Sequence, residues 1–140
     1  AVLQKVNLLG FLQTQNGLQT ELLEKAGNLS GGQCQRLVIA RALLRSDSAV
    51  YIFDEAASNI DVESEELIMN VIHELAKTKT VLLISHRLAN VVQSDQIYFL
   101  KNGTICERGT HAELMEQNGA YCHLYDSQMV LENYGKEGNA

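Results

Sequence analysis

The sequence has no proline and only three cysteines in 140 residues. Cys34, Cys106 and Cys122 are far apart and form no C-x-x-C pair, which argues against a disulfide framework and favours a reducing compartment. No apolar run approaches the ~20 residues of a membrane helix, and no secretory signal pattern is present. The net charge of −6 argues against a dedicated nucleic-acid binder, because such proteins are usually basic. We therefore expect no nucleic-acid partner.

What remains is ordinary for one globular domain, with 46% hydrophobic and 20% charged residues. The chain starts at Ala1 without a methionine, inside an expected helix, so we expect it to be a piece of a longer protein. Strands that alternate with helices after a helical start indicate an α/β fold. Strands 49–53 and 80–84 have no polar alternation, which predicts a parallel sheet covered on both faces. We expect helices at 1–15, 30–45 (mostly buried), 62–77, 87–93, 112–117 and 119–131, and a hairpin of strands 96–100 and 104–107 around Asn102-Gly103.

Residues 29–33 read Leu-Ser-Gly-Gly-Gln and precede the apolar helix 30–45. Ser30 and Gln33 form an S-x-x-Q capping box, in which each side chain accepts from the other residue's backbone N–H. Gly31 and Gly32 are poor helix formers that leave the first turn bare. A bare helix N-terminus attracts phosphate, although an ordinary cap is the better explanation of these residues when they are taken alone.

Acidic and imidazole side chains follow the two apolar strands. Asp54 and Glu55 end the first strand, at the edge where open α/β sheets bind ligands, and His86 follows the second strand. Each also has a structural reading, the carboxylates as a solvated loop start and His86 as a packing residue. Asp61 is fully explained as the N-cap of helix 62–77. His73, His111 and His123 are read as helix-surface or cap residues.

Residues 29–33, 50–55, 58–61 and His86, in this order and spacing, resemble the signature, Walker B, D-loop and switch-histidine motifs of ATP-binding cassette (ABC) ATPases. The resemblance covers nearly the whole chain. Residues 85–88, 101–103 and 109–114 resemble the exporter branch. Asn59 and Ile60 depart from the usual D-loop pattern, and Cys34 departs from the usual residue after the signature.

The resemblance implies roles for these residues. Glu55 would be the general base and His86 the γ-phosphate-binding switch. Asp54 would hold Mg²⁺, through water. In the family, two domains close head to tail, and the signature and D-loop of one domain contact the ATP bound by the other. In this chain the residues that would make these contacts are Ser30, Gly31, Gly32, Gln33 and Asp61.

The chain contains no G-x-x-x-x-G-K-[ST] loop, which in the family precedes the signature. The resemblance therefore implies a partial P-loop NTPase (RecA-like) core with part of the ABC helical subdomain. Residues 1–45 would belong to the helical subdomain, 46–131 to the ATPase core and 132–140 to a flexible tail. The strand that leads to this loop in the family is missing as well. Strand 80–84 would therefore have a free edge, so we expect the isolated chain to self-associate.

The implied parent is the ATPase of an ABC transporter that couples ATP hydrolysis to export. Its membrane domain would be fused upstream, and the ATPase would lie at the cytoplasmic face of the membrane. Two other readings stay open. A DNA-repair or chromosome-organising ATPase would carry a long coiled coil near the signature, and none is present. A non-catalytic interaction module describes the chain taken alone better, and we expect this chain to be inactive without the missing loop, whereas Glu55 and His86 argue against this reading for the parent. The sequence does not identify the transported substrate.

Overall fold

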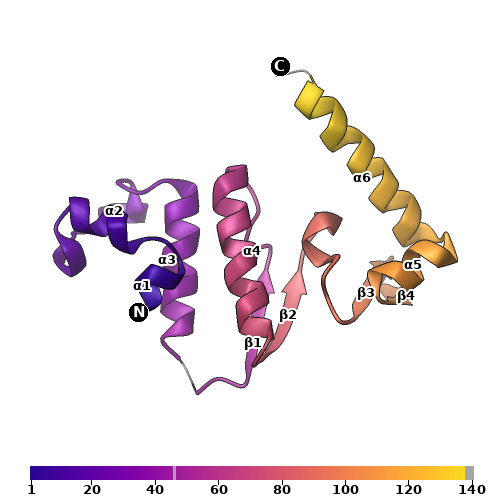
Figure 1. Cartoon of the computed structure of the whole chain (residues 1–140), viewed down its shortest axis with the longest axis horizontal. Coiled ribbons are helices and arrows are strands. Elements are labelled where there is room, and N and C mark those ends of the chain that lie inside the picture. Colours follow the sequence, from indigo (N-terminus) through magenta and orange to yellow (C-terminus); the bar gives the residue numbers. More distant parts are fainter. Residues whose placement is uncertain (46, 138–140) are drawn as a thin grey trace. The chain divides into compact units, whose positions relative to one another are not determined.

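The computed structural model describes residues 1–45 and 47–137. The chain divides into two units, Ala1–Ile84 and Ser85–Ala140, and each is described by itself. We expected a division after residue 45 into subdomains of a larger domain, which stays a prediction. Figure 1 labels the helices and strands of both units and colours them in sequence order.

The first unit begins with two short helices, α1 (Val2–Lys5) and α2 (Leu9–Thr14), where we expected one helix over residues 1–15. Asn7 breaks the helix with a left-handed φ of 51°, a conformation that asparagine adopts more readily than most residues. Residues two apart on a helix point in nearly opposite directions. The break therefore lets both Val6 and Leu8 reach the core, where they are 1% and 2% exposed. Two short 3₁₀ turns follow, η1 (Gly17–Gln19) and η2 (Glu24–Ala26).

Helices α3 (Gly31–Leu43) and α4 (Val62–Ala76) pack against each other. Their buried side chains form the core of this unit with residues of segments 6–12 and 51–57. We expected α3 to be mostly buried, and this is wrong. Val38 is 52% exposed because α3 packs through one face only. The buried core consists of Val6, Leu8, Leu12, Ile39, Ala40, Tyr51, Phe53, Ala57, Ile68, Met69 and Ile72.

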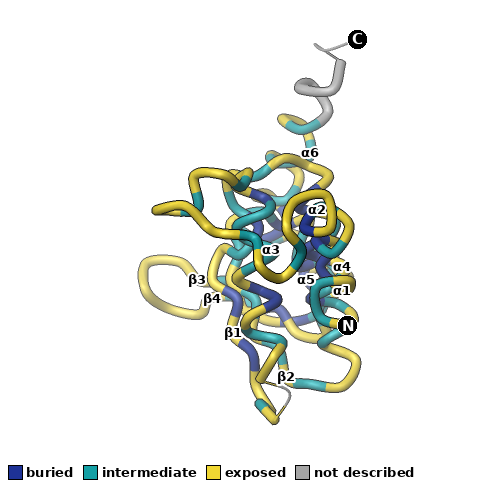
Figure 2. Tube along the Cα trace, turned by 90° about the vertical axis from the view of Figure 1, so that its left-hand side faces the viewer, coloured by how far each residue is buried: buried dark blue, intermediate teal, exposed yellow. Residues whose placement is uncertain are grey.

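Strands β1 (Val50–Asp54) and β2 (Thr80–Ile84) form the expected parallel pair, with α4 as the crossover between them. The expectation that both faces are covered is wrong. Tyr51 and Phe53 point into the core at 7% and 6% exposure, whereas Val50 and Ile52 are 55% and 65% exposed. This alternation is visible along β1 in Figure 2. Among the described residues the sheet has these two strands alone, and on its outer face Leu82 and Ile84 are also exposed, at 49% and 46%.

The second unit contains an antiparallel hairpin, β3 (Ile97–Lys101) and β4 (Thr104–Gly109). Asn102 and Gly103 both have positive φ, 52° and 76°, as the predicted two-residue turn requires. The expected helix 87–93 is a 3₁₀ turn, η3 (Leu88–Val91), and α5 (His111–Gln117) begins with the predicted capping box of Thr110 and Glu113.

The last helix, α6 (Ala120–Glu137), continues beyond Leu131, where we expected it to end, so residues 132–137 are helical. Residues 138–140 of the expected tail lie outside the described residues. Tyr121 and Leu114 are fully buried and join α6, α5 and the hairpin into a small second core. Glu107 of β4 accepts from the backbone N–H groups of Ala120 and Tyr121, which fixes the start of α6.

Candidate functional site

The N-terminus of α3 carries the predicted capping box. The Ser30 hydroxyl accepts from the Gln33 backbone N–H at 3.1 Å, and the Gln33 side chain accepts from the Ser30 N–H at 2.9 Å. Within the described chain, the N–H groups of Gly31 and Gly32 have no hydrogen-bond acceptor. Ser30 and Gly31 are exposed. The helix start therefore presents two free donors and a positive dipole end, which fits an anionic group.

The two glycines of this turn differ in what surrounds them. A Cβ on Gly32, which is buried, would lie 2.5 Å from the Ser64 Cβ and 3.2 Å from the Asp61 Oδ2. Gly32 is therefore required by the close approach of α3 to the start of α4. A Cβ on Gly31 would meet only Ile60, at 3.9 Å. Packing does not explain Gly31, and its bare surface is available to a ligand.

The structure brings the signature turn and the D-loop, residues 58–61, side by side. Asp61 caps α4, and its carboxylate accepts from the Ser64 backbone N–H at 2.8 Å. This bond, the Ser64 hydroxyl and the nearby Arg36 guanidinium together lower the pKa of Asp61. Asn59, which departs from the usual D-loop pattern, has a φ of 56°. Asparagine tolerates this left-handed conformation, so the backbone explains the departure.

Asp54 and Glu55 occupy the C-terminal end of β1, as predicted, and both are exposed. The Glu55 N–H donates to the Ile84 carbonyl at 2.9 Å, which extends the pairing with β2 by one residue. Glu55 then turns the chain away with a φ of 47°. A glutamate in this left-handed region is strained, and such strain is concentrated at functional sites.

His86 belongs to the second unit, and its side chain is exposed. Its backbone carbonyl accepts from the Gln128 side chain at 2.8 Å. The same Gln128 side chain accepts from the Leu88 backbone N–H at 2.9 Å. Gln128 of α6 thus binds the loop that carries His86. The sequence did not predict this contact.

Arg36 is a second residue that the sequence did not reveal as part of the site. Its guanidinium donates to the carbonyl of Gly32 at 3.3 Å and to that of Asn7 at 3.1 Å. Arg36 therefore ties the break between α1 and α2 to the signature turn. Its place one turn after Gly32 is the only sequence signal, and charge alone does not distinguish it from Arg41.

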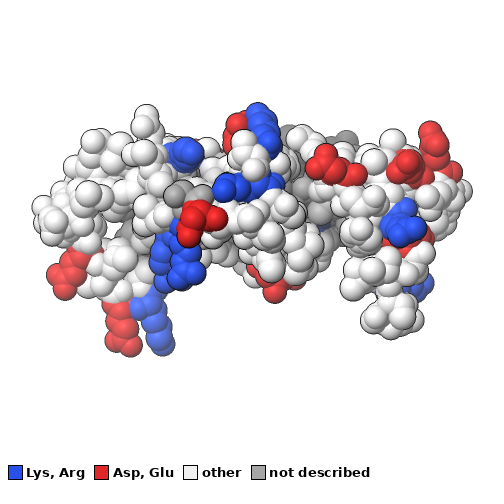
Figure 3. Space-filling view, turned by 90° about the horizontal axis from the view of Figure 1, so that it is seen from below, with Lys and Arg blue, Asp and Glu red and all other residues white. Residues whose placement is uncertain are grey.

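The described residues contain no cluster of three or more acidic, histidine or cysteine side chains that could hold a metal ion. At the end of β1 the exposed Asp54 offers a single carboxylate, and Mg²⁺ accepts one carboxylate when water or phosphate oxygens supply its other ligands. Acidic and basic side chains are mixed on the face shown in Figure 3.

No helix among the described residues has the length and apolar character needed to cross a membrane.

Comparison with known proteins agrees with this geometry. The sequence pattern of the ABC transporter family matches residues 2–58. An uncharacterized ABC transporter ATP-binding protein of Haemophilus influenzae is 51% identical over 140 residues, 100% of this chain and 25% of that protein. An ATP-dependent lipid A-core flippase of Mannheimia succiniciproducens is 53% identical over 114 residues, 81% of this chain and 19% of that protein.

A solved structure, a bacterial Atm1-family ABC exporter with ATP bound, is similar to this chain with a TM-score of 0.80 and 31% identity. The similarity covers 91% of this chain and 22% of that one. The chain thus spans about a quarter or less of the length of these relatives. The α/β fold is that of part of a P-loop NTPase domain.

Proposed function

Because the chain belongs to the ATP-binding domains of ABC transporters, we propose that it is the C-terminal part of such a domain, in an exporter driven by ATP hydrolysis. The observation that carries this proposal is the exposed turn at the start of α3. It combines a complete capping box with two free N–H donors at Gly31 and Gly32. This arrangement suits the γ-phosphate of an ATP held by a second domain.

The C-terminal end of β1 would serve the other ATP, bound in this domain's own site. Asp54 would hold Mg²⁺ through water, and the ion would offset the charge on the β- and γ-phosphates. Glu55 would accept a proton from the attacking water. His86 would donate a hydrogen bond to the γ-phosphate. The exposed carboxylates at the end of β1 and the strained φ of Glu55 support these roles.

The partners follow from the same proposal. Two ATP-binding domains would close head to tail, so that the signature turn and Asp61 of one face the ATP of the other. A membrane domain fused upstream would place them at the cytoplasmic face of the membrane. The flippase relatives suggest a lipid as one class of cargo.

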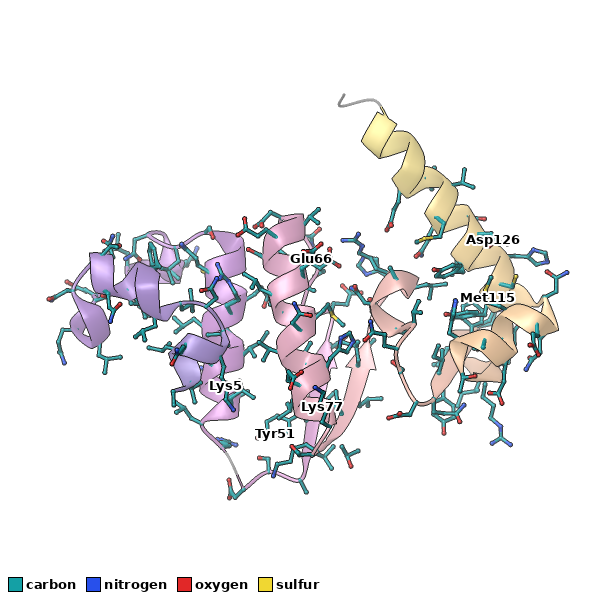
Figure 4. All side chains as sticks on the ribbon, viewed as in Figure 1. Lys5, Tyr51, Glu66, Lys77, Met115 and Asp126 are labelled. Carbon is teal, nitrogen blue, oxygen red and sulfur yellow. The ribbon has the colours of Figure 1, made fainter. Side chains whose placement is uncertain are left out.

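The test uses the longer protein that we propose contains this chain. Glu55→Gln should reduce ATP hydrolysis by at least ~100-fold and leave nucleotide binding intact, so that closed dimers accumulate. Glu66→Gln removes an exposed carboxylate from α4, labelled in Figure 4, and should change neither property. Ser30→Arg should prevent closure, because it fills the phosphate position. Unchanged turnover in Glu55→Gln would exclude Glu55 as the base.

A further inference from the structure

The loop from Ser85 to Leu88 is attached to α6 by one side chain that acts in two directions. The Gln128 amide donates from Nε2 to the His86 carbonyl at 2.8 Å and accepts at Oε1 from the Leu88 N–H at 2.9 Å. Gln128 is half-buried and lies two residues after Asp126, which Figure 4 labels on α6. Both contacts are made within the second unit.

These two bonds have the pattern of a parallel β-bridge. A residue in a parallel strand donates to the carbonyl before its partner residue and accepts from the N–H after it. Gln128 does this around Arg87, whose φ of −93° and ψ of 107° are extended. The side-chain amide therefore replaces one residue of a neighbouring strand, at the point where the chain leaves β2.

Two further contacts restrict the same loop. The Ser85 hydroxyl accepts from the Arg87 N–H at 3.0 Å and donates to the Arg87 carbonyl at 3.1 Å. The Arg87 guanidinium pairs with Glu132 at 3.2 Å. Glu132 lies four residues after Gln128 and so on the same face of α6. Leu88, which ends the loop, is buried at 6% exposure.

We propose that Gln128 is a positioning residue for His86, through which α6 sets the backbone that presents the imidazole. The proposal rests on the function proposed above for His86. Gln128 touches no reacting atom in this assignment and acts only through the loop. While Gln128 of α6 makes both hydrogen bonds, the loop presents His86 for γ-phosphate contact. If these bonds break, the loop is no longer held in that position.

The chemistry requires glutamine at this position. The bridge needs one donor and one acceptor on a single planar group, which a primary amide supplies. Glutamate keeps an acceptor for the Leu88 N–H but has no donor for the His86 carbonyl. Alanine removes both, and asparagine is one methylene shorter. Gln128→Glu therefore breaks one half of the bridge selectively.

The first experiment measures amide hydrogen exchange by NMR in the 140-residue chain. Gln128→Ala should speed exchange at Leu88 by about tenfold, with no change at Leu114 in the second core. Gln128→Glu should leave Leu88 exchange within about threefold of the parent and still shift the His86 ring signals. Ser127→Ala, an exposed neighbour on α6, is the matched control and should change neither. Unchanged Leu88 exchange and unchanged His86 signals in both Gln128 variants would overturn the proposal.

The second experiment measures ATP hydrolysis by the longer protein. Gln128→Ala and Gln128→Glu should lower kcat by about tenfold or more with little change in KM, because misplaced groups lose transition-state contacts. Ser127→Ala should have the parent kcat. Faster exchange at Leu88 with unchanged kcat would refute the positioning role, although it would show that Gln128 protects the Leu88 N–H. An unmodified protein without ATPase activity would instead refute the proposed function, while the exchange result would remain valid.

Discussion

The packing of the signature turn against α4 predicts opposite effects for two adjacent glycines. Gly32→Ala places a methyl group 2.5 Å from the Ser64 Cβ, far inside the 3.5–4.0 Å optimum for carbon atoms. Ser64 is 5% exposed, and its backbone N–H is bonded to the Asp61 cap. The serine therefore cannot move without weakening the start of α4.

The change in the free energy of unfolding combines two destabilising terms and one stabilising term. Overpacking of this kind costs about 1–3 kcal/mol, and a weakened N-cap adds about 1 kcal/mol. Alanine is favoured over glycine in a helix by at most about 1 kcal/mol. We expect Gly32→Ala to destabilise the first unit by about 1–3 kcal/mol. Gly31→Ala meets only Ile60, at 3.9 Å. It should be neutral or stabilising by up to about 1 kcal/mol.

Urea unfolding of the 140-residue chain measures both effects, and amide exchange at Ile72 assigns them to the first unit. Ser64→Gly should partly rescue Gly32→Ala, because it removes the side chain that the new methyl group meets. The coupling between the two substitutions should be at least about 1 kcal/mol. Equal stability of the two alanine variants, or the absence of coupling with Ser64, would refute the packing argument.

Three further predictions concern the same 140-residue chain. Isothermal calorimetry with Mg-ATP should detect no micromolar binding, because a helix terminus contributes only ~0.3–1 kcal/mol per charge contact; a micromolar dissociation constant would contradict this. Sedimentation at low micromolar concentration should show self-association, because β2 pairs with β1 alone among the described strands and Leu82 and Ile84 are 49% and 46% exposed. A monomer with protected β2 amides would disprove it, and Leu82→Lys should weaken the association. Hydrogen bonds from the Thr110 backbone N–H and hydroxyl lower the pKa of Glu113 below 4.5. The stabilisation from this cap is therefore complete above pH 4.5 and is lost as the pH falls through the lower folded pKa. Glu113→Gln should remove this part of the acid sensitivity of the second unit, as followed by unfolding at pH 3–6, and an unchanged pH profile would exclude the carboxylate as its source.

Local features were determined by the sequence itself. The capping boxes at Ser30 and Thr110, the N-cap at Asp61 and the Asn102-Gly103 turn were all confirmed. Each depends on hydrogen bonds or backbone angles within about four residues, so the residue types at fixed spacing are sufficient. The parallel pairing of β1 and β2 was also predictable, because two apolar strands joined by a helix leave few other arrangements.

Burial and helix continuity depended on the tertiary structure. The break at Asn7 forms because Val6 and Leu8 both gain a place in the core, which local propensity does not register. The exposure of Val38 and Ile52 depends on which faces of α3 and β1 meet other elements of this chain. An apolar run specifies that some surface will be buried and leaves open what covers it.

The candidate site divides in the same way. The sequence placed Asp54, Glu55 and His86 at the ends of strands, since the apolar runs that precede them define those ends. It could not assign Gly32 to the packing against Ser64, nor Gln128 to the bridge around Arg87, which lies some forty residues away. These contacts join residues that are distant along the chain. Only the folded chain sets their distances, because a glycine or a glutamine carries no local signal of its future neighbour.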